Sequence, residues 1–600
     1  MEKMKQQLRR SQFVLMYGQG SIIEGPNGSR LIPSFEGLGE KNCNDAFFKK
    51  YEIQDIRMSR MLNDKTKMEN YLVSIPSNDA IDENEPRVIY STVIFPIWHV
   101  CYNRNPHILY QEWLGETHCD AYNPDKCGEC DKQNNPNVRF VRACPDGHLD
   151  EIHWNMEVHD NSNESCEGSK YFYWDVGGSS MSDIVITCPK CGSSTNMNEI
   201  YSNKRKCTGR LPEKEKLMGY GVTVTKPNRK RNCDGFMSVI QKQSSSLKIN
   251  ITKTLLKIPQ FDESIMDSFT NSWLCGFLGT LDFGAVITKE ILKKEAINKL
   301  HPSDYKRLSK YLENHEVEDL VNELKRVDSR KSDYCSAIDE EFDSLRGNQY
   351  TSANFSKSEF LPYTLKGLNY EMPLNVCAID KLTTVTAQLY YQRNPHIKKD
   401  ENGEPVESEW VDIGYFDEST KKRWYPAYKG VGEGLFITSK HNPFDLCDLK
   451  ETVNHWNSCD VDVSDERPEV KDPLFVWWHT LSHAIIKSLS LSCGYVSASL
   501  HERVYIDRDT GEGGILIYNT SPGEDSGMGG LVDIVFNENE FNKVLNNAMN
   551  SLLVCSNDPL CSSIKLEDGG VNGAACHNCL LISETSCEHQ NRLLDRHFFI

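Results

Sequence analysis

The pattern of hydrophobic and polar positions changes several times along the chain. Residues 88–100, VIYSTVIFPIWHV, are rich in β-branched and aromatic side chains, which favours a strand. From residue 289 to residue 346 the apolar positions recur instead at helical intervals, as at Leu308 and Leu312. A stripe with this spacing is typical of a helix face that is buried in a core, so this stretch predicts helices.

Strand-like patterns return at residues 370–440, in VTAQLYYQR and in the glycine-rich VGEGLFI. Residues 473–500 are apolar over most of their length and predict a long buried helix. The segment GGILIYNTSPG, which follows, predicts a core strand that enters a loop.

The composition is that of an ordinary globular protein. The chain has 600 residues, of which 38% are hydrophobic and 26% are charged, so we expect several domains. The N-terminal MEKMKQQLRRSQ has no apolar core, and no apolar run reaches the roughly 20 residues of a membrane span. We therefore expect a cytoplasmic protein whose 22 cysteines serve more as metal ligands and small core residues than as disulfides.

Residues 101–240 combine paired cysteines with polar turns, as zinc ribbons do. The first predicted zinc site follows the spacing C-x2-C-x13-C-x3-H, and its four ligands are Cys127, Cys130, Cys144 and His148. Neighbouring Cys101, Cys119 and Cys166 leave the choice of ligands open. The alternative is a set of buried, reduced cysteines without metal.

The second predicted zinc site follows the spacing C-x2-C-x15-C-x25-C, and its ligands are Cys188, Cys191, Cys207 and Cys233. Residues 203–232 carry ten basic and two acidic residues, a local charge of +8 in a chain of charge −19. Phosphate backbones attract such segments without sequence preference. The predicted nucleic-acid contacts are Lys204, Arg205, Lys206, Arg210, Arg229, Lys230 and Arg231. The alternative is a solvated loop that balances an acidic neighbour.

A third predicted zinc site lies near residue 570. Its ligands are Cys561, Cys576, Cys579 and Cys587, with Cys555 as a substitute. Because four thiolate or imidazole ligands close the coordination sphere of zinc, we expect about three structural zinc ions and no catalytic one.

Motifs of catalysis are weak in this sequence. His479 and His483 have the spacing of a metalloprotease motif, but Thr480 stands where the catalytic glutamate is needed, so a core or interface pair is favoured. The dipeptide Gly-Lys does not occur, which excludes a standard phosphate-binding loop for ATP. We therefore predict no catalytic residues and no enzyme activity.

Several segments together resemble one family. The C-terminal cysteine knuckle, followed by NRLLDR, resembles the MrfA-type zinc-binding domain. Five further segments resemble the stand-alone DrmB family of the DISARM anti-phage system. These segments are residues 9–29, 139–154, 424–436, 479–505 and 514–532. The resemblance implies a subunit that binds a superfamily-2 helicase of the DrmA type and engages DNA with it. One departure is Arg104, which stands where a second cysteine after Cys101 is expected.

The predicted architecture is α+β and multidomain, with zinc-ribbon-like insertions, a helical middle segment and a C-terminal zinc-binding α/β domain. The predicted regions are a mixed β region (1–100), a zinc-ribbon region with the basic loop (101–240), a helical region (241–370), a second mixed β region (371–470) and the MrfA-type domain (471–600). Two other functions stay open at this point: a metal-dependent nuclease or other DNA-acting enzyme with an unrecognised site, and a scaffold that contacts only protein.

Overall fold

The structure is a computed structural model. It describes residues 10–25, 28–34, 51–53, 55–66, 69–74, 92–111, 136–160, 166–215, 217–218, 223–224, 233–258, 277, 288–313, 317, 333–347, 351–352, 354–393, 398–399, 405–406, 410–417, 422–461, 463, 467–492, 494–521, 530–567 and 570–600.

The chain forms two compact units, and each unit collects stretches that are far apart in sequence. The first unit comprises Met1–Ile53, Met68–Lys253 and Thr386–Tyr428; the second comprises Gln54–Lys67, Thr254–Val385 and Lys429–Ile600. The boundary falls within three strands, β17 (Ile249–Leu256), β20 (Glu371–Gln392) and β25 (Lys422–Ser439). Helices and strands occur in both units, which confirms the α+β class.

The first unit is built mainly from small antiparallel sheets. One contains β1 (Ile22–Gly25), β2 (Gly28–Leu31) and β5 (Val93–Ile94). Another has the order β12 (Ser194–Asn196), β11 (Ile184–Thr187), β10 (Tyr171–Val176), β7 (His107–Gln111) and β6 (Trp98–Cys101). A third has the order β13 (Arg205–Lys206), β16 (Phe236–Gln241), β8 (Phe140–Ala143) and β9 (Leu149–Asp150).

The remaining elements of the first unit are short. Its helices are α1 (Arg10–Leu15), α4 (Trp154–His159) and α5 (Met197–Ser202). Its other strands are β3 (Glu52–Ile53), β4 (Asn70–Ser74), β14 (Leu217–Met218), β15 (Thr223–Val224), β21 (Lys398–Lys399), β22 (Pro405–Val406), β23 (Val411–Asp412) and β24 (Tyr415–Asp417). Residues 88–91 of the predicted strand at 88–100 lie outside the described ones. The rest of it forms β5 and β6, which are separated at the proline at position 96 because proline offers no N–H group to a ladder.

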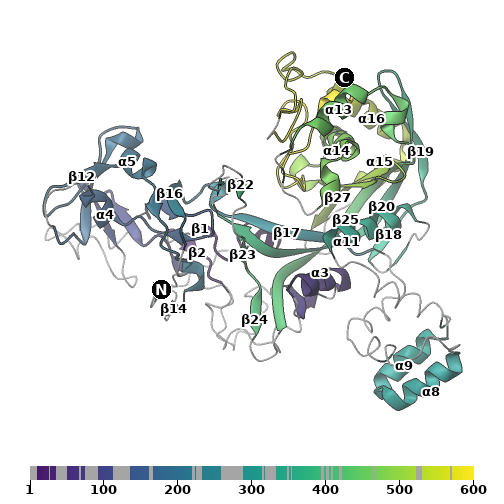
Figure 1. Ribbon diagram of the computed structural model, residues 1–600, viewed down its shortest axis with the longest axis horizontal. Helices are drawn as coiled ribbons and strands as arrows, with labels where there is room; N and C mark the ends of the chain where they lie inside the picture. Colours follow the sequence, from purple (N-terminus) through teal and green to yellow (C-terminus); the bar gives the residue numbers. More distant parts are fainter. Residues whose placement is uncertain are drawn as a thin grey trace. The chain divides into compact units, whose positions relative to one another are not determined.

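The core of the second unit forms around one helix, α14 (Pro473–Ser492). Nearly all of its side chains are buried, including Trp477, Trp478 and Ile485. A helix that is apolar on every side must be covered on every side. It lies among α13 (Lys450–Ser458), α16 (Glu538–Leu553) and β27 (Glu512–Ser521), as Figure 1 shows in green and yellow. The predicted long buried helix is thus confirmed, and it ends before Gly494, whose φ of 72° is unsuited to most side chains.

Strand β26 (His501–Asp507) presents two different faces because side chains alternate along a strand. Val504 and Ile506 belong to the same hydrophobic core as α14, and Glu502 lies on this face as well. Tyr505 points to the other face, where its ring stacks on Phe342 of α11 (Tyr334–Arg346) at 5.4 Å between centroids. β26 pairs with β27, the predicted core strand, which in turn pairs with β25.

The other elements of the second unit are the helices α3 (Ile56–Thr66), α8 (Lys289–Lys299), α9 (Pro302–Tyr311), α12 (Pro443–Leu446) and α15 (Gly530–Phe536) and the strands β18 (Phe355–Lys357) and β19 (Leu361–Lys366). The helices predicted between residues 289 and 346 correspond to α8, α9 and α11, and residues 314–316 and 318–332 of that stretch lie outside the described ones. Of the described helices, none combines the length and the apolar character that a bilayer crossing requires.

Candidate metal centres

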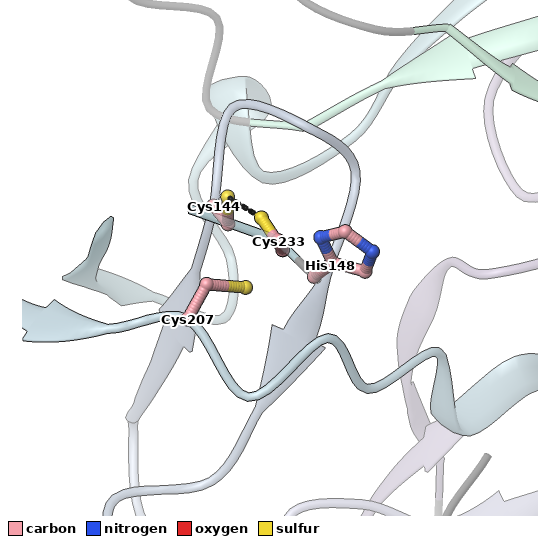
Figure 2. A group of neighbouring side chains, drawn as sticks. All are labelled: Cys144, His148, Cys207 and Cys233. Atoms are coloured by element: carbon pink, nitrogen blue, oxygen red, sulfur yellow. Dashed lines mark hydrogen bonds between the residues drawn. The ribbon is translucent and has the colours of Figure 1, made fainter. Parts of the chain in front are cut away.

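The first cluster consists of Cys144, His148, Cys207 and Cys233. Their side chains converge on one point, as Figure 2 shows, and the four ligand atoms lie within 4.8 Å of one another. The sulfur atoms of Cys144 and Cys233 are 3.8 Å apart. Three thiols and one imidazole form a common ligand set for structural zinc.

Strand pairing brings these four residues together. Cys144 and His148 flank the tight turn between β8 and β9, in which Gly147 has a φ of 83° and the N–H of Cys144 donates to the carbonyl of His148. Cys207 directly follows β13 and Cys233 shortly precedes β16, and these two strands pair with Lys206 opposite Phe236. The pairing therefore closes the long interval between Cys207 and Cys233, and the shared sheet carries both pairs of ligands to one end.

Two backbone N–H groups of the first cluster suit negatively charged sulfur, whereas the carboxylate of Asp146, 3.3 Å from Cys233 Sγ, acts against it. The backbone N–H of Gly209 donates to Cys207 Sγ at 3.3 Å, and the N–H of Asp146 points to Cys144 Sγ at 3.5 Å. Such N–H groups stabilise thiolates, which are the form that binds zinc. Without metal, a hydrogen bond with the thiol of Cys207 and burial raise the pKa of Cys144. A bound cation removes that obstacle.

The second cluster consists of His159, Cys166, Cys188 and Cys191. His159 is the last residue of α4, and the two C-x2-C cysteines lie in the turn between β11 and β12. In this turn Gly192 has a φ of 76° and its N–H donates to the carbonyl of Cys188. Cys191 Sγ lies 3.3 Å from His159 Nε2, while His159 Nδ1 donates to the carbonyl of Asn155 at 2.6 Å. The second ring nitrogen is thus left for a metal.

The thiol of Cys191 in the second cluster has a lowered pKa. A hydrogen bond from the Ser193 hydroxyl and one from the Ser193 backbone lower the pKa of Cys191 to about 6. A thiol with this pKa is largely ionised at neutral pH and can bind zinc without a large proton cost.

The predicted ligand sets for the first two sites differ from these clusters. The structure does not bring Cys188 and Cys191 together with Cys207 and Cys233; it places the latter pair with Cys144 and His148. The second cluster is completed by His159, which was not predicted as a ligand, and by Cys166, whose role was left open. Cys127 and Cys130 lie outside the described residues, as does Cys119, and Cys101 is buried in a small apolar cluster with Ile108 and Tyr110.

The third cluster consists of Cys555, Cys561, Cys576 and Cys579 in the second unit. The distance between Sγ atoms is 3.6 Å for Cys555 and Cys576, and 3.7 Å both for Cys561 and Cys579 and for Cys576 and Cys579. A tetrahedral site with Zn–S bonds of about 2.3 Å has edges of about 3.8 Å. The sulfur spacing therefore fits zinc closely, and the same holds for Cys144 and Cys233 in the first cluster.

Backbone groups also support the third cluster. Burial opposes ionisation of Cys576, but N–H groups of Cys579 and Asn578 and the nearby thiols outweigh it and lower the pKa of Cys576 to about 6. Lys487 of α14 donates to the carbonyls of His577 and Asn578 at 3.0 and 3.1 Å, which fixes the knuckle to the core helix.

Cys587 does not belong to the third cluster, although it was predicted from the sequence to be one of its ligands. Cys555, the substitute in that prediction, takes its place: it lies shortly after the end of α16, and its Sγ is 3.6 Å from Cys576 Sγ. Cys587 Sγ lies instead 3.3 Å from His479 Nε2 on α14.

The NRLLDR motif holds this region together. Arg596 is fully buried; its guanidinium donates to the carbonyl of Leu552 at 3.0 Å and pairs with Asp558 at 2.7 Å. Asp595 accepts the N–H of Ala574 at 2.9 Å. The motif is thus a support for the segments that carry the third cluster.

The predicted nucleic-acid contacts divide into three groups. Lys204 and Lys206 are exposed. Arg205 pairs with Glu157 and Asp160, and Arg210 pairs with Asp150 and Glu215, so both guanidinium groups already have carboxylate partners. Arg229, Lys230 and Arg231 lie outside the described residues. The charge that remains for a phosphate backbone is smaller than the sequence count of +8 indicates.

Two regions of the chain match known protein families. Residues 9–248, which include the first two clusters, match a domain of unknown function (DUF8724). Residues 481–580, which include the whole third cluster, match the MrfA Zn-binding domain. The second match, together with the thiol geometry, shows that the chain carries a zinc-binding domain, and the three clusters are of the kind that can hold zinc.

Most of the chain also aligns with one curated relative. The DISARM protein DrmB of Bacillus paralicheniformis is 26% identical over 569 residues, which are 88% of this chain and 91% of that protein. The resemblance to DrmB is confirmed. A solved structure, the crystal structure of DUF1998 helicase MrfA bound to DNA, aligns at 12% identity with a TM-score of 0.17. That alignment covers 34% of this chain and only 22% of the helicase chain, an overlap too weak to establish a shared fold.

Proposed function

We propose that this chain is a non-catalytic, zinc-stabilised subunit that associates with a superfamily-2 helicase of the DrmA type and helps it to bind DNA in anti-phage defence. The observation that carries the proposal is the similarity to a DISARM protein along 88% of the chain. The MrfA Zn-binding domain match supports it. The proposed place of action is the cytoplasm.

The metal clusters support a structural role. Each of the three offers four protein ligands to a metal. A zinc ion held in this way has no free position at which to activate water or polarise a substrate. In this proposal the ATP-driven step belongs to the helicase partner, because the sequence has no phosphate-binding loop.

Association with the helicase is the first test. The two proteins are purified separately, mixed at micromolar concentration and separated by size-exclusion chromatography. The proposal expects co-elution in a complex of defined mass. Separate elution over a range of salt concentrations contradicts the subunit role.

DNA binding is the second test. The net charge of −19 repels a phosphate backbone, so we expect the chain alone to bind DNA weakly and the complex to bind it more tightly than either protein alone. Equal affinities of the helicase and the complex contradict a shared DNA surface and favour a scaffold. Cleavage of labelled DNA with Mg²⁺ or Mn²⁺ that follows the protein through purification favours a nuclease instead.

The basic segment can be tested separately in the complex. Replacing Arg229, Lys230 and Arg231 by alanine is expected to reduce the slope of log affinity against log salt by about 0.9 for each phosphate that the variant no longer neutralises. The matched control replaces Lys293, Lys294 and Lys299 of α8, which removes the same charge elsewhere. If both variants show the same slope of log affinity against log salt, Arg229, Lys230 and Arg231 do not contact DNA.

A further inference from the structure

Four chemically reactive side chains meet inside the second unit. His479 and His483 lie one turn apart on α14, Glu502 lies on β26, and Cys587 lies in the segment after the knuckle. Their exposed fractions are 0, 0, 1 and 4%, and one ligand atom of each lies within 4.8 Å of the others. Polar and charged groups in an apolar core are costly unless their charges and lone pairs find partners. Something must therefore compensate this group.

Both histidines are oriented by backbone carbonyls. His479 Nδ1 lies 3.0 Å from the carbonyl of Leu593, and His483 Nδ1 lies 3.0 Å from the carbonyl of Leu580. Because a carbonyl only accepts hydrogen bonds, each Nδ1 must carry the proton. Each Nε2 is then directed into the group with its lone pair. This outer hydrogen bond is typical of histidines that bind metals.

The carboxylate is oriented in a similar way. Ser482 donates its hydroxyl to one oxygen of Glu502, and the other oxygen, Oε1, faces the histidines. It lies 2.7 Å from His479 Nε2 and 3.4 Å from His483 Nε2. Neither Glu502 Oε1 nor His483 Nε2 has a well-aligned hydrogen bond, so both atoms are open to a cation. A cation between them satisfies all four ligands at once.

The backbone next to Cys587 is strained. Gln590, Asn591 and Leu593 have φ angles of 56, 60 and 66°, a region that side chains other than glycine and asparagine rarely occupy. The turn delivers two groups to the same place: the N–H of Asn591 donates to Cys587 Sγ at 3.3 Å, and Leu593 offers the carbonyl for His479. A bond from the sulfur to a metal would offset the strain of this turn.

We infer that His479, His483, Glu502 and Cys587 bind a fourth metal ion, separate from the three clusters above. Imidazole, thiolate and carboxylate ligands in fourfold coordination suit zinc. The charges balance, because a divalent cation neutralises one carboxylate and one thiolate in the apolar core. With ligand bonds of about 2.1 Å, tetrahedral coordination separates nitrogen and oxygen by about 3.4 Å. The distance from His483 Nε2 to Glu502 Oε1 has this length already, and the distance from His479 Nε2 to Glu502 Oε1 increases when the metal binds. The closed site joins α14, β26 and the C-terminal segment.

The first test compares the zinc content of the full-length chain with that of Cys587→Ser by native mass spectrometry. The variant is expected to hold one zinc fewer per chain. The matched control is Cys377→Ser, a fully buried cysteine outside all four groups, which is expected to keep the full content. A folded Cys587→Ser protein with unchanged zinc content overturns the inference.

The second test needs no variant and therefore does not depend on one that folds. The wild-type chain is loaded with cadmium-113 and its NMR spectrum is recorded. The proposed site is expected to give a resonance far upfield of those from the thiolate-rich clusters, because it supplies a single thiolate. A spectrum with the thiolate-rich resonances and no single-thiolate resonance overturns the inference. Neither outcome bears on association with a helicase.

Discussion

Glu151 places a carboxyl group inside the first unit. Its side chain is 6% exposed, and Oε1 accepts the backbone N–H of Ile97 at 2.9 Å. Burial raises the pKa of Glu151 to about 7, although the guanidinium of Arg210 acts in the opposite direction. A carboxyl that binds its proton more tightly in the folded state favours folding at low pH. Its contribution falls as pH rises from about 4.5 to about 7 and then stays low.

This titration predicts a pH-dependent effect of Glu151→Gln. Glutamine keeps the acceptor oxygen for Ile97 and cannot ionise, so the variant should be more stable than the wild type at pH 8, with a smaller gain at pH 6. Each pKa unit of difference corresponds to about 1.4 kcal/mol. The measurement is thermal unfolding between pH 6 and pH 8, and Asp175→Asn on the exposed end of β10 is the control. A gain that is equal at both pH values contradicts the assignment.

Cys555 and Cys587 provide a second prediction for single residues. Cys555→Ser is expected to release zinc from the third cluster, because Cys555 Sγ lies 3.6 Å from Cys576 Sγ. Cys587→Ser is expected to leave that zinc in place. Alkylation of Cys576, followed by mass spectrometry, distinguishes the two, since a cysteine that is released from its metal becomes open to the reagent. More labelling of Cys576 in Cys587→Ser than in Cys555→Ser contradicts this expectation and restores the ligand set expected from the sequence.

Sequence reasoning identifies ligand types at this scale but not their partners. A C-x2-C pair is local, so the spacing of Cys188 and Cys191 is enough to place both sulfurs in one turn. Which residues complete the tetrahedron depends on contacts between distant strands and helices. The closeness of Glu502 to His479 depends on how β26 lies against α14, which no local pattern encodes.

At the scale of elements, β26 carries charge on the face opposite α14 as well. Glu341 of α11 is fully buried and accepts hydrogen bonds from Arg57 at 3.0 Å and from Arg503 at 2.6 Å. It also accepts the backbone N–H of Leu256 at 2.8 Å. One carboxylate thus pairs with two buried guanidinium groups and joins α3, α11, β17 and β26 within the second unit.

Removing that carboxylate should destabilise the second unit strongly. Glu341→Ala leaves two buried arginines without their shared counter-charge, for which the expected loss is about 3–5 kcal/mol. The neighbouring Glu340→Ala is the matched control: Glu340 is 20% exposed and contacts Arg57 at 3.3 Å, and we expect a loss below about 1 kcal/mol. Urea unfolding followed by tryptophan fluorescence compares the two. Similar losses contradict the central role of Glu341.

The elements themselves follow from sequence more readily than their contacts do. The long apolar run of α14 and the shorter apolar run of β27 are visible in the sequence because burial on all sides leaves a local pattern. The pairing of β13 with β16 leaves no such trace. It depends on a register between strands about 30 residues apart, and the composition of the first cluster depends on it in turn.

At the scale of the whole molecule, the clusters differ in their access to solvent. In the second cluster only Cys188 is buried, whereas His159, Cys166 and Cys191 are half-buried. Three of the four ligands of the third cluster are buried, and all four members of the His479 group are. A chelator reaches a metal through exposed ligands, so the order of exposure predicts an order of metal release.

Treatment with a chelator is therefore expected to empty the second cluster first. Aliquots are alkylated over time, and the labelled cysteines are identified by mass spectrometry. Cys191 should be labelled before Cys555 and Cys561. Labelling of Cys555 ahead of Cys191 contradicts the order. Loss of all metals in a single step would indicate that the two units unfold together.

The division of the chain into two units could not be predicted from local sequence patterns. The five predicted regions follow one another in sequence, whereas each unit of the structure contains three separate stretches. A local pattern reports whether a segment is helix or strand, but long strands such as β20 and β25 contribute residues to both units. Only the pairing of those strands decides the assignment.

The ligands of the first two clusters are nested in the chain. Those of the second, from His159 to Cys191, all fall between His148 and Cys207 of the first. During synthesis on the ribosome, Cys144 and His148 thus remain without partners while the Cys188–Cys191 knuckle appears. A zinc ion bound by Cys144, His148, Cys188 and Cys191 together would join ligands of two different clusters. His159 and Cys166 emerge before the knuckle, so the correct partners are already beside it when its sulfurs become available.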